Sequence, residues 1–273
     1  MPDMSTFDPT LIYALFKGDP GTRKSTTALS YPSPQYWFSW DRKMGGMMLP
    51  MIKWGLNPKH IQYDDYEDWN KAKTKFEQFQ LNCPFKTLVI DSITSMADMT
   101  LRQTRQMKKG IKRQSGADAG KTIAGIAVNE LEDYNAESSA LNELIALTKD
   151  IHIFHKVNII LIAHVVQAEM KSPNGETHFS RTIVTAGKRV APKIPAYCGE
   201  VYHFNIEKGF NADSGGEYAF LTEHTGDDFA RTGLPLAKKI IFNDKPVYST
   251  YILPAIEKLK EDAKNNPQNQ PKL

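Results

Sequence analysis

A lysine and a serine follow a glycine-containing turn near the start of the chain, with the spacing of a phosphate-binding loop. The segment Gly18-Asp19-Pro20-Gly21-Thr22-Arg23-Lys24-Ser25-Thr26 contains the pattern Gly, four free positions, Gly, Lys, Ser/Thr, except that Arg23 replaces the second glycine. In such loops the backbone N–H groups and the dipole of the following helix bind phosphate oxygens. We therefore expect residues 18–26 to bind a nucleotide, with Lys24 on the β- and γ-phosphates and the Ser25 hydroxyl on Mg²⁺.

Arg23 departs from the pattern, because glycine normally lets the backbone pass close to a phosphate. A side chain is tolerated there if Arg23 has right-handed helical dihedral angles at the start of a helix. Its guanidinium could then add a phosphate contact. The alternative interpretation is a turn that precedes Lys24 and Ser25 by chance.

A second motif, Lys86-Thr87-Leu88-Val89-Ile90-Asp91-Ser92, places a carboxylate after a run of aliphatic and β-branched residues. Such a run is typical of a buried parallel strand, and ligands of open α/β sheets bind at the carboxyl ends of the strands. We expect Asp91 to hold Mg²⁺ opposite Ser25, directly or through water. The alternative is that Asp91 only caps the segment that follows. The two motifs together predict a site for ATP and Mg²⁺.

Length and composition indicate one soluble α/β domain, because 273 residues with 41% hydrophobic and 24% charged residues is an average composition. A net charge of +3 is mild, so any surface for a polyanion must be local. The two cysteines, Cys83 and Cys198, have no metal-ligand spacing, and the sequence shows neither a secretion signal nor an apolar stretch of the ~20 residues that span a membrane. We expect a cytoplasmic protein without a membrane partner.

The elements that must position these residues follow from local patterns. We expect an N-terminal arm at 1–10, an ATPase-type domain at 11–258 and a disordered tail at 259–273, which is rich in Asn, Gln, Pro and Lys. Within the domain the patterns predict strands at 11–16, 36–40, 87–91, 158–163, 201–206 and 218–222, helices at 25–29, 65–79 and 129–157, and an irregular segment at 42–57.

Two segments, at about 102–125 and 167–190, are rich in basic residues and are predicted to be loops. Gly110, Gly116 and Gly120 indicate that the first is mobile. A charged run is commonly only a solvated surface. The basic residues are Arg102, Arg105, Lys108, Lys109, Lys112, Arg113 and Lys121 in the first segment, and Lys171, Arg181, Lys188 and Arg189 in the second.

The order of these elements resembles the RecA-like ATPase core. Over about residues 10–235 the chain has, in order, a phosphate loop, a strand before Asp41, a strand ending in Asp91, a long helix, a strand ending in His164, a polar loop and antiparallel strands. More narrowly, residues 87–95, the strand up to His164 and the later Gly187-Lys188 are similar to phage-encoded RecA-like nucleotide-binding proteins, some of which are single-strand annealing recombinases. The resemblance implies an α/β RecA-like P-loop NTPase core with a mostly parallel central sheet, flanking helices and antiparallel strands on the C-terminal side. It also implies the cytoplasm of a phage-infected bacterial host.

The resemblance assigns further roles to single residues. His164 matches the position of a polar γ-phosphate sensor, with Gln167 as an alternate; otherwise His164 is an ordinary imidazole at a strand end. The glutamate that is catalytic in the family is absent, and Asp41 is its substitute, unless Asp41 only caps a helix or forms a salt bridge. With Lys24 and Asp91 these residues make up the predicted catalytic set.

The resemblance also places single-stranded DNA at both basic segments. The residues expected to contact DNA are Arg102, Arg105, Lys108, Lys109, Lys112, Arg113, Lys121, Lys171 and Arg181. RecA-like ATPases complete their site with a cation from the next protomer of a ring or filament, and Lys188, Arg189 and Arg231 are the candidates. The segment 227–232 could equally be a surface turn with a weak ion pair.

Three functions fit the sequence. The first is an oligomeric ATPase that acts on single-stranded DNA in recombination, annealing or replication, with a single-strand-binding or replication protein as a further partner. The second is a small-molecule phosphotransferase whose lid is the segment at 102–121. The third is a non-catalytic, ATP-switched loader, which the missing glutamate and Arg23 favour over a fast enzyme.

Overall fold

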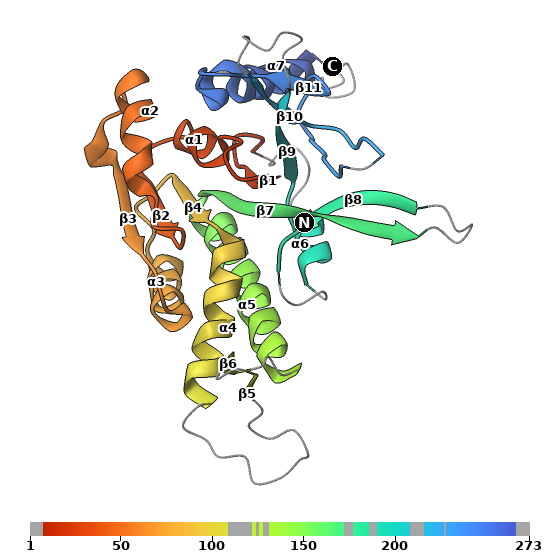
Figure 1. Ribbon diagram of the computed structural model, residues 1–273. Helices are drawn as coiled ribbons and strands as arrows, with labels where there is room; N and C mark the ends of the chain where they lie inside the picture. The colour runs from red at the N-terminus through yellow and green to blue at the C-terminus, as the bar shows by residue number, and fades with distance from the viewer. Residues whose placement is uncertain are drawn as a thin grey trace, which may run out of the picture.

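A mixed nine-stranded sheet forms the centre of the computed structural model (Figure 1). The structure describes residues 8–108, 122–123, 126–127, 131–171, 177–185, 190–207, 216–226 and 228–265. The strand order is β11-β10-β9-β1-β7-β4-β2-β3, with β8 paired to β7. The strands are β1 (Tyr13–Gly18), β2 (Gln35–Ser39), β3 (Ile61–Asp65), β4 (Thr87–Asp91), β7 (Asn158–Lys171), β8 (Thr177–Ile183), β9 (Glu200–Glu207), β10 (Glu217–Leu221) and β11 (Lys239–Ile241).

Six neighbouring strands of this order, β9, β1, β7, β4, β2 and β3, run parallel to one another. Strands β10 and β11 pair antiparallel at the C-terminal side. This confirms the predicted mostly parallel sheet with antiparallel strands beside it. The short strands β5 (Thr122–Ile123) and β6 (Ile126–Ala127) form a separate pair. Because parallel strands present their carboxyl ends at one edge, the ends of β1, β2 and β4 lie together there, beside His164 of β7.

Helices cover both faces of the sheet, and the strands are apolar on both sides for that reason. One face carries Leu15, Phe38, Ile90 and Leu161, which lie in one buried cluster with residues of α3 (Trp69–Leu81), α4 (Ile93–Lys108) and α5 (Leu131–His155). The other face carries Phe16, Trp37, Val89 and Ile160, which cluster with residues of α1 (Lys24–Leu29), α2 (Met48–Lys53) and α7 (Leu253–Asn265). Figure 1 shows α4 and α5 packed side by side below the sheet. Because successive side chains of a strand point to opposite faces, residues of the two buried clusters alternate along each strand.

The first basic segment begins as a helix, which corrects the prediction of a loop from residue 102. Helix α4 continues to Lys108, so Arg102, Arg105 and Lys108 are helical. The reason is an apolar stripe at Ile93, Met96, Ala97 and Leu101, all buried, which has helical spacing and packs against the core. The residues Lys109, Lys112, Arg113 and Lys121, which are predicted to contact DNA, lie outside the described part of the chain.

The second basic segment is a β-hairpin rather than a loop. Strand β7 does not end at His164 but continues to Lys171, and β8 returns antiparallel with Val165 opposite Ile183. These two side chains are buried, which anchors the base of the hairpin. Lys171 and Arg181 therefore lie on strands, while Lys188 and Arg189 lie outside the described residues.

Three other local predictions were wrong. The segment 42–57 contains the 3₁₀ turn η2 (Met44–Met47) and helix α2 rather than irregular chain. The predicted helix at 65–79 starts later, at Trp69, and is preceded by edge strand β3, whose exposed side chains lack an apolar pattern. Residues 259–265 belong to helix α7 rather than a disordered tail, because Ala255 and Ile256 are buried and hold this helix against the core.

The remaining described elements are short. They are η3 (Pro58–His60), η4 (Ala191–Lys193), α6 (Ile194–Tyr197) and the π-helical turn η5 (Tyr248–Ile252). Within the described part of the chain, no helix combines the length and apolar character needed to cross a membrane.

Candidate functional site

The glycine-containing loop connects β1 to α1 at the carboxyl edge of the sheet. Gly18 lies between His164 of β7 and Phe204 of β9 in the parallel register. A Cβ on Gly18 would come within 2.2 Å of the Phe204 carbonyl oxygen, and Gly21 has a positive φ of 80° with open space around it. The loop therefore requires glycine at position 18 for close packing and at position 21 for its backbone conformation.

Lys24 turns back over this loop. Its Nζ donates hydrogen bonds to the carbonyl oxygens of Gly18 at 2.8 Å and Asp19 at 2.7 Å, and to Thr22 Oγ1 at 3.3 Å. Burial lowers the pKa of Lys24 to about 8, although the carboxylates of Asp91 and Asp19 favour its charged form. The ammonium group is thus held inside the curve of the loop, where a bound anion would meet it.

Asp91 ends β4 and meets the first turn of α1. The Ser25 side chain and the Lys24 ammonium are both close enough to the Asp91 carboxylate to favour its charged form and lower its pKa. Burial nevertheless raises the pKa of Asp91 to about 6. The structure therefore brings Lys24, Ser25 and Asp91 together, as the two sequence motifs predict. A hydroxyl and one carboxylate are a donor set that suits Mg²⁺, which commonly completes its shell with water and phosphate oxygens.

Asp41 and His164 lie beside this group. Asp41 follows β2, and its Oδ2 lies 3.4 Å from His164 Nε2. The Ser92 hydroxyl donates to Asp41 Oδ1 at 3.2 Å, and the Ser95 hydroxyl donates to the same oxygen. Burial disfavours the Asp41 carboxylate, but the hydrogen bonds from His164 and Ser95 outweigh it and lower its pKa to about 2.

His164 is placed by helix α4 and strand β1. Its backbone N–H donates to Thr94 Oγ1 at 3.0 Å, and it pairs with Gly18 of the loop. Its Nδ1 is buried and has no hydrogen-bond partner among the described residues. His164 therefore contacts Asp41 with one ring nitrogen, while the other is buried and unpaired among the described residues.

Arg23 differs from both expectations. Its backbone is left-handed, with φ 64° and ψ 25°, rather than right-handed helical. Its guanidinium does not join Lys24 but donates to the Asn243 carbonyl at 2.8 Å and to Asp244, and it lies 3.8 Å from the centre of the Tyr218 ring. The position keeps the conformation that glycine normally provides, and the arginine side chain contacts the C-terminal elements.

The basic residues expected to contact DNA are only partly described. Arg102 is exposed on α4 and forms an ion pair with Asp98 at 2.6 Å. Arg181 Nη1 donates to Asp228 Oδ2 at 2.9 Å, although its side chain remains 40% exposed. Arg231 donates to the carbonyl oxygens of Ala196 and Cys198 near the start of β9.

A buried polar cluster beside the loop was missed by the sequence analysis. Lys17 and His203 lie next to each other on β1 and β9, and each is 2% exposed or less. Asp228 lies 3.5 Å from His203 and also pairs with Arg181. The alternative of a surface turn at 227–232 is therefore wrong for Asp228, which is buried. The sequence feature that could have indicated this buried cluster is Lys17, a lysine directly before Gly18 at the end of an otherwise apolar strand.

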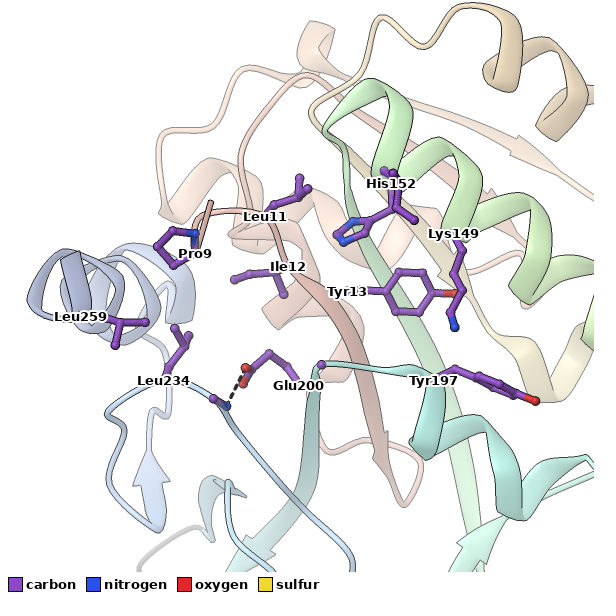
Figure 2. A pocket seen from close by; sticks show the side chains of 13 residues that line it. Pro9, Leu11, Ile12, Tyr13, Lys149, His152, Tyr197, Glu200, Leu234 and Leu259 are labelled. Carbon is purple, nitrogen blue, oxygen red and sulfur yellow. Dashed lines mark hydrogen bonds between the residues drawn. The ribbon is translucent and has the colours of Figure 1, made fainter. Parts of the chain in front are cut away.

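A pocket of about 370 Å³ lies at the opposite edge of the sheet (Figure 2). Tyr13 at the start of β1 and Glu200 at the start of β9 line it, together with His152 of α5 and Leu259 of α7. Glu200 is occupied within the protein, because it accepts from the Gly233 N–H at 2.9 Å and from two hydroxyls. This pocket is formed at the amino ends of the parallel strands, away from Lys24 and Asp91.

Comparisons with known proteins match the chain to one family and to a solved structure. The model of a family described as an AAA domain matches residues 12–232, a range that contains the loop, Asp41, Asp91 and His164. Among solved structures, a KaiC-like protein from the hyperthermophilic archaeon Pyrococcus horikoshii OT3 is similar, with 13% sequence identity and a TM-score of 0.45. That match covers 85% of this chain and 89% of the other. No curated protein matches the sequence.

Proposed function

Because the chain belongs to the AAA domain family, we propose that it binds ATP with Mg²⁺ at the phosphate loop and hydrolyses it. The observation that carries the proposal is the contact of the Ser25 hydroxyl with the Asp91 carboxylate beside Lys24. Two separate chain segments, the loop with the start of α1 and the end of β4, have to meet to form this group. Their meeting at the carboxyl edge of the sheet supports a nucleotide site there.

The residues fit the triphosphate and the cation. Gly21 leaves the loop backbone open, and Lys24 offers a buried ammonium to phosphate oxygens. When bound, Mg²⁺ neutralises charge on the phosphates, and Ser25 and Asp91 would hold it. Lys24 would exchange its contacts with the Gly18 and Asp19 carbonyl oxygens for contacts with phosphate.

Asp41 and His164 are the groups that would orient a water molecule. The low pKa of Asp41 keeps it ionised at neutral pH, so it accepts hydrogen bonds and is a weak base. Its hydrogen bond with His164 fixes the imidazole beside Gly18. We infer slow turnover, because Asp41 is engaged by His164, Ser92 and Ser95 instead of being free to receive a proton.

We further propose that single-stranded DNA is the effector, and that the protein acts as a homo-oligomer in phage recombination, annealing or replication. Support comes from the resemblance to RecA-like proteins and from the position of the β7–β8 hairpin, which continues directly from His164. A strand shared by the sensor position and the hairpin would connect nucleotide and DNA. Arg181, at the base of the hairpin, is the described basic residue that would contribute to this surface, and Lys188 and Arg189 remain candidates for the cation supplied to a neighbouring protomer.

One titration series tests these proposals. ATP affinity and ATPase rate are measured for the wild type and for Lys24→Ala, with and without single-stranded DNA, from about 50 to 200 mM salt. We expect Lys24→Ala to abolish ATP binding while circular dichroism stays unchanged, and DNA to stimulate hydrolysis with a steep loss of stimulation as salt rises. An exposed substitution, Lys71→Ala on α3, serves as the matched control.

The other outcomes separate the alternative functions. Unchanged ATP affinity in Lys24→Ala removes the assignment of the loop. Turnover that is indifferent to DNA favours a phosphotransferase. ATP binding with negligible turnover favours a non-catalytic, ATP-switched loader, a function that the occupied Asp41 carboxylate specifically supports.

A further inference from the structure

The loop has three positions with positive φ, and one of them is not glycine. Gly18, Gly21 and Arg23 have φ values of 154°, 80° and 64°. A residue with a Cβ is disfavoured in the left-handed region, so Arg23 needs contacts that keep it there. Arg23 also begins α1, because its carbonyl oxygen accepts the N–H of Thr27 at 2.9 Å. The conformation of Arg23 therefore sets the direction of the peptide that leads to Lys24.

The contacts that hold Arg23 come from the C-terminal part of the chain. The guanidinium donates to the Asn243 carbonyl oxygen and the Asp244 carboxylate, and it stacks over Tyr218 of β10. Asn243 Oδ1 accepts the backbone N–H of Tyr218 at 2.9 Å, which joins the turn to the strand. The arginine is thus held between the Asp244 carboxylate and the Tyr218 ring, and we call these three residues the clamp.

Asp244 is itself fixed by α2. Lys53 Nζ donates to its carboxylate, and Trp54 Nε1 donates to its backbone carbonyl oxygen at 2.9 Å. The carboxylate remains 55% exposed, so it is accessible and can be changed without opening the core. The clamp joins residues about 220 positions apart in the sequence and reaches none of the predicted catalytic residues directly.

We propose that Asp244 is a positioning residue for the phosphate loop. By holding the Arg23 side chain against Tyr218, it keeps the backbone of Arg23 left-handed, so that the loop has its phosphate-binding shape before ligand arrives. If the loop adopts this shape for only a fraction of the time, its apparent affinity for nucleotide is the intrinsic affinity multiplied by that fraction. The inference rests on the proposed nucleotide binding. In it, the Asp244 carboxylate keeps position 23 in the left-handed conformation that a glycine would adopt without help.

A double-mutant cycle tests the clamp. The affinity for a fluorescent ATP analogue is measured for the wild type, Asp244→Ala, Arg23→Gly and the double variant. We expect Asp244→Ala to weaken binding about fivefold, equal to about 1 kcal/mol, in the wild-type background. We expect no further weakening in the Arg23→Gly background, because glycine adopts the left-handed conformation without a clamp. Asp244→Asn, which keeps the shape and an acceptor, should give an intermediate loss.

Two controls separate this effect from general destabilisation. Lys53→Ala removes the other cation on Asp244 but leaves Arg23 in place, so affinity should stay within about twofold of wild type. Hydrogen exchange of the loop amides, measured without nucleotide, should rise in Asp244→Ala and not in the double variant.

The cycle has outcomes that overturn the inference. An equal loss of affinity in both backgrounds means that Asp244 acts independently of Arg23, and no loss, or tighter binding, means that the clamp does not prepare the loop. Lys24→Ala is measured in parallel. If it binds the analogue as well as wild type does, the proposed function fails; if it does not bind but the cycle shows no coupling, only the clamp fails.

Discussion

Replacing Lys17 with methionine should stabilise the protein at neutral pH. The Lys17 side chain is only 2% exposed, and its hydrogen bond to the Arg181 carbonyl oxygen is long, at 3.4 Å. Burial lowers the pKa of Lys17 from 10.5 to about 8; attraction by Asp228 offsets part of this effect, and repulsion by Arg181 adds to it. Methionine fills similar space without a charge.

The size and sign of the effect follow from proton linkage. Because the pKa is lower in the folded state, the buried ammonium destabilises the fold at every pH below about 8. A difference of about 2.5 pKa units corresponds to about 3 kcal/mol. This cost disappears as the pH rises from about 8 to 10.5, where the folded protein has lost the proton and the unfolded chain is still losing it.

Urea unfolding of wild type and Lys17→Met at pH 7, 8, 9 and 10 measures the effect. We expect the variant to be more stable by up to about 3 kcal/mol at pH 7, with a difference that shrinks steadily above pH 8. Lys71→Met, on the exposed face of α3, is the matched control and should change stability by no more than about 0.5 kcal/mol. A variant that is no more stable at pH 7, or whose advantage persists undiminished at pH 10, would refute the reasoning.

Three more predictions concern the site itself. Gly18→Ala should destabilise the fold by about 3 kcal/mol or more, because its Cβ would lie 2.2 Å from the Phe204 carbonyl oxygen; thermal unfolding measures this, and an unchanged melting temperature contradicts the packing. Asp41→Asn should cost about 2 kcal/mol at pH 7 in chemical unfolding. The pKa of Asp41 is lowered to about 2, so this contribution is present above pH 4 and is lost as the pH falls through 2; a loss that is independent of pH would contradict it. His164→Ala should leave ATP affinity within about twofold but lower the hydrolysis rate by about 10² or more, since His164 contacts Asp41 rather than Lys24; a large loss of affinity with normal turnover would be the opposite result.

The meeting of Lys24, Ser25 and Asp91 could be predicted from sequence because local chemistry indicates it. Glycines in a turn, a lysine after them and a carboxylate at the end of an apolar run are each visible in short segments. The conformation of Arg23 could not be predicted, because it depends on Asp244 and Tyr218, which lie some 200 residues away. The burial of Lys17 and Asp228 likewise becomes evident only when β1, β8 and β9 are assembled.

The errors in the fold share a physical cause. Glycines and positive charges at 102–121 suggested a loop, but the apolar stripe from Ile93 to Leu101 carries the helix on to Lys108. Strand β7 was expected to end where its apolar run ends. It extends further because β8 supplies hydrogen bonds that no local pattern reveals. Composition failed on the secondary structure of both segments, because charge alone does not determine backbone pairing.

Asp41 and Asp91 show how the same burial can prepare two carboxylates for different roles. Both end up at the edge formed by β2 and β4, where the backbone N–H of Asp41 donates to the Asp91 carbonyl oxygen at 3.3 Å. Asp41 receives hydrogen bonds from two serines and His164, so its charge is already stabilised within the protein. Asp91 receives one from Ser25 and keeps a raised pKa, so its charge gains most from an added cation. From this difference in hydrogen-bond donors we expect a metal ion to bind Asp91, while Asp41 holds the histidine.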